Sequence, residues 1–133
     1  MITADQFIGK TLIATTSISS ITTADRIRHG LRPIGTVLPA INFYKLSGNN
    51  TILSSEVYSI NCRATDITTA MRLSKLVKTI FCGSNNLGTY GSDSVSGVNV
   101  FNASKISLNQ EHGAILESDG SIWNVPIDIL IVY

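Results

Sequence analysis

The sequence of 133 residues has few charged side chains: Asp, Glu, Lys and Arg make up 14% of it, against about 25% in a typical soluble domain. The formal net charge is +1, so the chain lacks the clustered Lys and Arg with which proteins grip nucleic acid. Its polar surface must therefore be built largely from Thr, Ser and Asn. A weakly charged exterior favours a protein whose surface is covered by partners, although an ordinary soluble domain with a neutral surface also fits.

Long apolar runs and closely spaced cysteines are missing as well. No stretch is long and apolar enough to span a membrane, and residues 1–10 lack the basic start and apolar run of a signal peptide. Cys62 and Cys82 lie far apart, and we expect both to be free thiols in a reducing cytoplasm. Hydrophobic residues make up 44% of the chain, enough for a core without a disulfide or a metal. We expect one domain over residues 1–133.

Residues that could carry out catalysis are scarce and scattered. The sequence has two histidines, His29 and His112, and no Gly-x-Ser-x-Gly nucleophile motif. A zinc site would need both histidines to meet both cysteines, but none of the four has the closely spaced partner typical of such sites. The run from Gly83 to Thr89 lacks the lysine of a phosphate loop and follows a predicted helix. Nothing in the sequence supports a carboxylate pair for acid–base chemistry. We therefore expect no enzyme activity, no cofactor and no metal.

The first half of the sequence predicts a helix, an arm and two strands. Apolar residues recur at helical spacing over residues 4–14, and the Ser/Thr-rich run that follows is expected to end that helix. Residues 25–40 contain several Gly and Pro residues and predict an irregular arm. Strands are predicted over residues 41–47 and 56–64, with a turn at residues 48–50. In the second strand apolar and polar residues alternate, which predicts a half-buried strand.

The middle of the sequence predicts the main helix and a loop. Thr65 or Asp66 is suited to cap a helix over residues 66–82, which carries a broad apolar stripe that includes Ile67 and Met71. Gly83 is expected to stop this helix. Residues 84–97 are polar and rich in Gly and Ser, and a loop of this length is usually functional or disordered.

The last third of the sequence predicts further strands. One is expected over residues 98–109. Residues 114–117 then lead into a hairpin turn at residues 118–120, and the last strand is expected over residues 122–133. Pro126 removes a backbone donor from the last strand, which suggests an edge or a bulge there. The order α-β-β-α-β-β-β predicts an α+β fold, with an antiparallel or mixed sheet of four to five strands and two helices packed on one face.

Three segments together resemble one protein family. The family's exposed arm and first strand are matched by RIRHGLRPIGTVLPAINFYKLSG, and its second strand and helix by EVYSINCRATDITTAMRLSKLVKTI. Its closing hairpin is matched by ILESDGSIWNVPIDILIVY, with Asp128 in the last strand. The first helix fits as well, so the resemblance covers about residues 4–133. The family is that of the tail terminator, or tail completion, proteins of long-tailed bacteriophages, and the match is one of pattern and order.

This resemblance implies mechanical work in a virion. Such proteins form a ring, usually a hexamer, on the head-proximal end of a finished tail tube. The ring stops tube growth and joins the tail to the head-side connector or stopper protein. Genomic DNA passes through its lumen without sequence-specific binding. The expected location is the tail or neck of the virion, assembled in the host cytoplasm. The alternatives are a small monomeric binding module or another head–tail connector (neck) protein.

Two segments supply candidate assembly contacts. Arg26, Arg28 and Arg32 form the one charge cluster of the sequence. They are either a solvated loop or an electrostatic contact with an acidic neighbouring ring or with DNA phosphates. Leu87 and Tyr90 are large apolar groups in the 84–97 loop. We expect them to anchor that loop on a neighbouring subunit or ring, because aromatic residues are favoured at interfaces.

Overall fold

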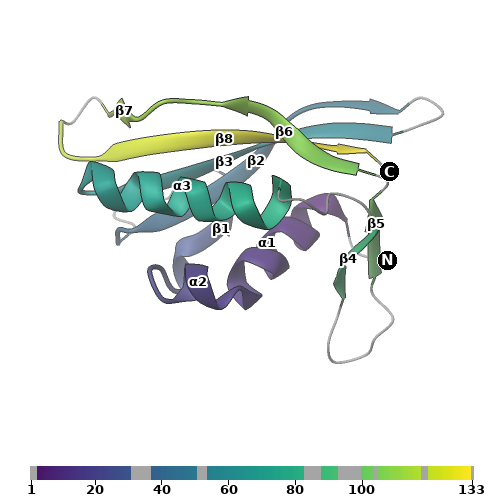
Figure 1. Cartoon of the computed structure of the whole chain (residues 1–133), viewed down its shortest axis with the longest axis horizontal. Coiled ribbons are helices and arrows are strands. Elements are labelled where there is room, and N and C mark those ends of the chain that lie inside the picture. The colour runs from purple at the N-terminus through teal and green to yellow at the C-terminus, as the bar shows by residue number, and fades with distance from the viewer. Residues whose placement is uncertain are drawn as a thin grey trace.

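A mixed β-sheet with helices on one face forms the body of the protein (Figure 1). The structure, a computed structural model, describes residues 3–30, 37–50, 54–82, 88–92, 100–103, 105–117 and 120–132. Within these residues, helices α1 (Ala4–Ala14), α2 (Thr16–Ser19) and α3 (Ile67–Cys82) lie on the same side of the sheet. The predicted α+β class, with a mixed sheet and helices on one face, is confirmed.

The sheet orders its strands β1-β2-β3-β8-β6, and β7 pairs with the other end of β8. The parallel pair is β1 with β2, and the remaining pairs of this sheet are antiparallel. A second, two-stranded sheet joins β4 to β5. The strand bounds are β1 (Ile27–His29), β2 (Ala40–Asn50), β3 (Ser54–Ala64), β4 (Gly88–Ser92), β5 (Val100–Ala103), β6 (Lys105–Glu111), β7 (Ile115–Leu116) and β8 (Trp123–Val132).

Helix α1 begins and ends where the sequence predicts. Gln6 Oε1 accepts a hydrogen bond from the Thr3 backbone N at 3.1 Å, which satisfies a donor at the helix start. The Ser/Thr-rich run was expected to contain no helix, but it forms α2. The hydroxyl of Ser19 bonds back to the Thr16 carbonyl, and Ile18 is buried in the core. Burial of this one side chain outweighs the weak helix propensity of its neighbours.

Helix α3 is capped by Asp66, one of the two predicted residues, whose Oδ2 accepts a hydrogen bond from the Thr69 backbone N at 2.9 Å. Its buried face holds Ala70, Leu73, Ser74, Val77 and Phe81. Ile67 and Met71 were predicted to lie in the buried stripe, and this was wrong, because both are exposed. They lie in the first turns of the helix, to one side of its buried face. Gly83 lies outside the described residues.

Four of the predicted boundaries need correction because tertiary pairing extends or divides the strands. The 25–40 segment is not wholly irregular, since residues 24–26 form a 3₁₀ turn and β1 follows on the edge of β2. Residues 48–50 continue β2 instead of forming its turn. Part of the 84–97 loop is strand β4, and the strand predicted over residues 98–109 is divided into β5 and β6. The main sheet therefore has six strands where four to five were expected.

Pro126 lies inside β8, a central strand, so the predicted edge position is wrong. Its carbonyl oxygen accepts a hydrogen bond from the His112 backbone N at 3.3 Å. The N and C=O of one strand residue point to the same side. The missing donor of Pro126 therefore faces the interval between β6 and β7, where neither strand pairs with it. The register shift lies instead in β6, between Leu108 and Gln110.

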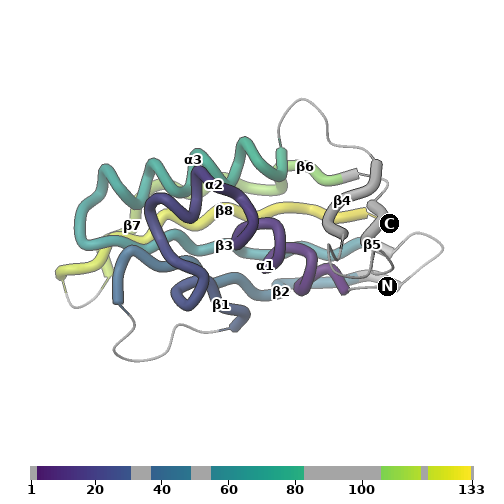
Figure 2. Tube along the Cα trace, turned by 90° about the horizontal axis from the view of Figure 1, so that it is seen from below, coloured from purple at the N-terminus to yellow at the C-terminus, as the bar shows by residue number. Residues whose placement is uncertain are grey.

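The core lies between the sheet and the helices. Figure 2 shows α3 running along the β8 and β6 side of the sheet, while α1 and α2 lie on the β1 and β2 side. The rings of Phe7 and Phe81, from α1 and α3, meet edge to face with centroids 5.9 Å apart. Side chains that are fully buried come from every layer and include Ile8, Leu12, Ile41, Ile60, Leu73, Val77, Ile106, Ile127, Ile129 and Ile131.

Truncating a side chain at the centre of this core should lower the stability of the protein. We expect Leu73→Ala to lower the free energy of unfolding by about 2–5 kcal/mol, because it removes buried methyl groups and leaves a cavity. Met71→Ala on the same helix is the matched control: Met71 is 53% exposed, so the loss should stay within about 0.5 kcal/mol. Urea denaturation of the three proteins measures both effects. Equal losses for the two variants would contradict the assigned face of α3.

Candidate assembly surfaces

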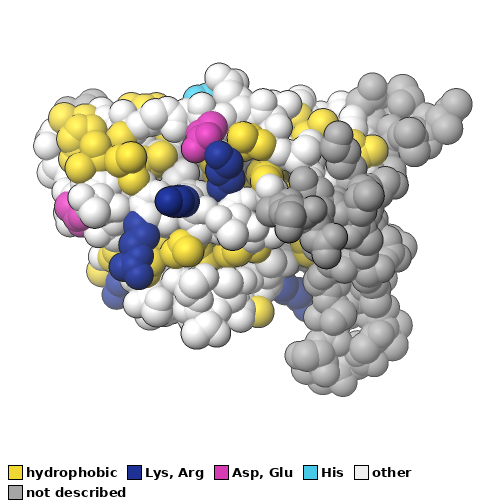
Figure 3. Space-filling view, viewed as in Figure 1, with side chains coloured by type: hydrophobic (Ala, Val, Ile, Leu, Met, Phe, Trp, Pro, Cys, Tyr) yellow, Lys and Arg dark blue, Asp and Glu magenta, His cyan; other side chains and the backbone are white. Residues whose placement is uncertain are grey.

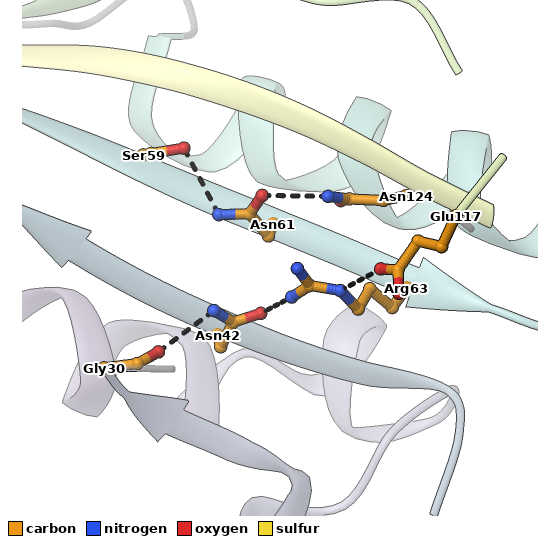
Figure 4. Close-up of polar contacts among 7 residues, drawn as sticks. All are labelled: Gly30, Asn42, Ser59, Asn61, Arg63, Glu117 and Asn124. Atoms are coloured by element: carbon orange, nitrogen blue, oxygen red, sulfur yellow. Dashed lines mark hydrogen bonds and ion pairs between the residues drawn. The ribbon is translucent and has the colours of Figure 1, made fainter. Parts of the chain in front are cut away.

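The face of the sheet opposite the helices carries a line of polar side chains that are nonetheless buried. They come from three adjacent strands: Asn42 from β2, Ser59 and Asn61 from β3, and Asn124 and Asp128 from β8. Asn124 Nδ2 donates to Asn61 Oδ1 at 3.0 Å, and Asn61 Nδ2 donates to Ser59 Oγ at 3.2 Å (Figure 4). The predicted alternation of β3 is confirmed, but Ser59 and Asn61 on its polar side are buried as well, so the strand is more than half buried although no described helix covers this face.

Arg63 connects this polar face to the ends of the sheet. Its guanidinium forms an ion pair with Glu117 and donates to Asn42 Oδ1 (Figure 4). Asn42 Nδ2 in turn donates to the Gly30 carbonyl oxygen at 3.0 Å. This chain of contacts ties the end of β1, strands β2 and β3, and the β7–β8 hairpin together. The charge of Arg63 is therefore compensated inside the protein and is not presented to a partner.

The remaining acid of this face is Asp128, which is 5% exposed. Its Oδ2 lies 2.9 Å from Nε2 of His112, whose side chain is partly exposed. Ser59 lies directly opposite Asp128 in the register of β3 and β8. The Ser59 hydroxyl takes its hydrogen bond from Asn61, however, and no described contact joins it to His112. The described contacts therefore join Asp128 to His112 and do not present an activated nucleophile.

A groove runs between α3 and the segment that joins β6 to β7, with a volume of about 1010 Å³. Lys78 Nζ pairs with Glu111 Oε2 at 3.1 Å across its rim. Figure 3 shows basic side chains spaced along the helix layer on this side of the molecule. The groove lining combines apolar and basic groups, among them Met71, Ala114, Val125, Arg72 and Lys75.

Exposed apolar side chains gather beside this groove, at the end of the sheet where β7 and β8 meet (Figure 3). We call this surface the end patch: Ile67 and Met71 at the start of α3, Leu116 in β7, and the half-buried Trp123. Leu116 and Trp123 are cross-strand partners, and Trp123 packs on the small core of Ala64, Ala70 and Val125. A cluster of this kind marks a surface that contacts another molecule more often than an isolated exposed leucine does.

The basic cluster predicted from the sequence is only partly described. Arg26 ends the 3₁₀ turn and Arg28 lies in β1, where its Nε donates to the Asp25 carbonyl oxygen at 2.9 Å. His29, next in the strand, lies 3.8 Å from an oxygen of Asp5. Arg32 lies outside the described residues. Arg26 and Arg28 are therefore held at an edge of the sheet, among acidic neighbours.

Of the two anchors predicted in the 84–97 loop, Tyr90 lies within the described residues. Tyr90 lies in β4, opposite Phe101 of β5, and Leu87 lies outside the described residues.

The sequence interpretation missed the line of buried polar side chains on the sheet, although a signal for it was present. Asn124 and Asp128 interrupt an otherwise apolar strand, and Ser59, Asn61 and Arg63 alternate with core residues. Polar groups that occur in this pattern on adjacent central strands are placed to bond one another.

Both cysteines are free, as the sequence predicts. Burial raises the pKa of the Cys62 thiol to about 12, and partial burial raises that of Cys82 to about 11. Among the described residues, no group of His, Cys, Asp and Glu side chains is arranged to hold a metal ion. In the same part of the chain, every helix is too short or too polar to cross a membrane.

The sequence matches no protein-family model and no curated protein sequence. Among solved structures, the fold is similar to that of a chain in the virion of a native gene transfer agent particle. The two share a TM-score of 0.61 and 8% sequence identity, over 94% of this chain and 90% of that chain. At this identity the likeness is one of fold, and it covers nearly the whole length of both chains.

The thiols offer a test of the packing around them. Alkylation requires the thiolate, so a raised pKa slows labelling until the pH approaches the raised value. In native protein at about pH 8, we expect iodoacetamide to leave Cys62 unlabelled and to label Cys82 slowly, whereas unfolding in urea should expose both. Mass spectrometry of digested samples identifies each site, and Cys82→Ala serves as the single-thiol control. Rapid native labelling of Cys62 would disprove the burial of β3.

Proposed function

We propose that this chain is a structural subunit of a virion. The observation that carries the proposal is the similarity of its fold, over nearly its whole length, to a chain of a gene transfer agent virion. A virion subunit works by contacting copies of itself and other components. The small share of charged residues and the exposed end patch both suit such a role. In this proposal the chain performs no catalysis, and its only partners are the molecules with which it assembles.

The more specific proposal is a tail terminator. It combines the resemblance of the sequence with the fold, because gene transfer agents are phage-like particles. In this role the chain forms a ring, which the resemblance predicts to be a hexamer, on the head-proximal end of a tail tube. The ring would stop the addition of tail tube protein and bind the head-side connector or stopper protein. Its location would be the tail or neck of the virion, assembled in the host cytoplasm.

Two surfaces of the chain suit different contacts in such a ring. The end patch lies at one end of the strands, so it suits contact with a component stacked on the ring. The polar face of the sheet suits the lumen. There the guanidinium of Arg63 is paired with Glu117, so this described cation of the face is not free to hold phosphates. Tight DNA binding depends on such cations, and DNA could therefore pass without sequence-specific binding.

The groove beside α3 favours a second candidate function. Its volume of about 1010 Å³ reaches the upper end of the range of small-molecule sites, about 300–1,000 Å³. A monomeric binding module could use the apolar floor and the basic rim to hold an anionic ligand. Another head–tail connector protein would share the end patch and the low charge of a terminator. The assembly state separates the binding module from both virion roles.

Assembly of the purified chain tests the ring. We expect native mass spectrometry and negative-stain images to show closed rings, and a substoichiometric amount of chain should shorten tubes grown from the tail tube protein of the same particle. A lone 14.3 kDa species under all conditions, with normal tube growth, would reject this function and favour the binding module. Rings that leave tube length unchanged would favour another connector protein.

The end patch is tested by one matched pair of variants. Leu116 is 47% exposed in the patch, and Ile13 is 44% exposed on α1, away from it. We expect Leu116→Asp to abolish the shortening of tubes while rings still form, because a charge at the centre of an apolar contact is costly to bury. Ile13→Asp should leave both properties unchanged. Normal tube shortening by Leu116→Asp would show that the end patch is not the stacking surface.

A further inference from the structure

Two strands of the main sheet have an edge without a described partner: β6 along its whole length, and β2 along more than half of its length. β6 ends the strand order on one side, so its outer edge meets no other described strand. On the other side, β1 covers β2 only at residues 41–43, which leaves the outer edge of residues 44–50 without a described partner. Rows of unpaired backbone N–H and C=O groups are templates for pairing with another chain.

These two edges lie at the same level of the sheet. Following the register across the strands, Lys105 of β6 is level with Val132, Ser55 and then Asn49 of β2. At the other end of β6, Glu111 is level with Ile127, Ile60 and then Phe43 of β2. The free edge of β6 and the free edge of β2 are therefore two sides of one four-stranded block, β2-β3-β8-β6.

The two edges also match each other in length. Each carries one more residue than the central strands over this span, because β2 has a register shift between Lys45 and Ser47 and β6 has one between Leu108 and Gln110. Leu46 and Asn109 are the extra residues. Both shifts occur at the level of the Tyr58–Ile129 pair of the central strands. The block therefore ends in two edge strands that resemble each other in length and in the position of the irregularity.

We propose that β2 of one copy pairs with β6 of the next copy, so that the sheets of neighbouring subunits join edge to edge around the ring. This inference rests on the proposed ring and names the contact that builds it. Strand direction alternates across the block, so the new pair is antiparallel like its neighbours. Matching the two spans places Phe43 opposite Glu111 and Asn49 opposite Lys105 of the adjacent copy. In that register Leu46 stands directly opposite Leu108.

Side chains at the two edges support this contact. Leu46 is 51% exposed and Leu108 is 37% exposed, and directly opposite residues place their side chains on the same face of a sheet. Two charged side chains at these edges, Lys45 and Glu111, are already paired within the chain. Lys45 pairs with Glu56 at 3.3 Å and Glu111 pairs with Lys78 at 3.1 Å. Bringing the edges together therefore buries two leucines against each other without opposing like charges.

The geometry also favours closure over open growth. A head-to-tail contact generates a ring if each step is a pure rotation and a helical filament if it adds a translation. Because the two edges span the same level, joining them adds no displacement along the strands. The register shifts contribute as well, since bulges bend a strand and increase its local twist. The sheet can thus curve from one copy to the next.

Disulfide cross-linking tests the register of this contact. In a Cys82→Ala background, the double variant L46C/L108C carries both halves of the contact, and opposite strand positions lie within disulfide reach. After mild oxidation, denaturing gels without reductant should show a ladder of dimers, trimers and larger species up to the full ring. Each single variant, L46C or L108C, should stay monomeric on the gel. The pair S47C/L108C is the control for register, and it should link far less because it is displaced by one residue.

The outcomes separate this inference from the proposed function. Rings in negative stain without the ladder would overturn the edge contact and leave the tail terminator role standing. Dimers formed by L108C alone would overturn it in favour of a symmetric pair. A lone monomer before cross-linking would overturn the ring and the edge contact together. As a second measurement, L46K and L108E should each abolish rings, and the combined variant should restore them because every contact then pairs opposite charges.

Discussion

The burial of one apolar face of the sheet beneath the helices is the constraint on which the rest of this structure depends. Ile127, Ile129 and Ile131 of β8 lie in one core cluster with Leu73 and Val77 of α3, and all five side chains are fully buried. A sheet of this kind is stable only if that face is covered. Once α1, α2 and α3 provide the cover, the opposite face and the strand edges are left to make contacts of another kind.

The polar contacts on the opposite face fix the register between neighbouring strands. The apolar core alone determines only which alternate residues of each strand point inward. A slip of one residue in β8 would turn Asp128 into the core and Ile129 outward. The hydrogen bond between Asn124 and Asn61, and the contact of Asp128 with His112, oppose such a slip because they require particular partners. Removing one partner would leave a buried polar group unsatisfied. Apolar packing thus sets the stability of the sheet, while the polar line holds its strands in one alignment.

Periodicity predicted the elements whose own sequence determines them, and missed those that depend on distant neighbours. The helix at residues 4–14, the cap at Asp66 and the alternation around Ile60 were readable because each depends on residues close in sequence. Strand β1 was not readable, since its pairing with β2 joins Ile27 to Ile41 across a segment rich in Gly and Pro. The edge position predicted for Pro126 was wrong for a related reason. Pro126 is tolerated in a central strand because it lies beside the interval between β6 and β7, and that interval depends on where these two strands end. The assembly surfaces combine edges and exposed side chains from several strands, and a single sequence does not show which of these remain uncovered.

The place of β8 in the chain has a consequence for synthesis. Of the described strands it is made after all the others, yet it lies between β3 and β6 in the sheet. On the ribosome, the hairpin of β2 and β3 and the helix α3 are therefore complete before the strand that fills the sheet emerges. Until then one edge of β3 has no strand to pair with, and such exposed strands are prone to aggregate. Nascent chains stalled before residue 123 should consequently depend on chaperones more than the finished protein does.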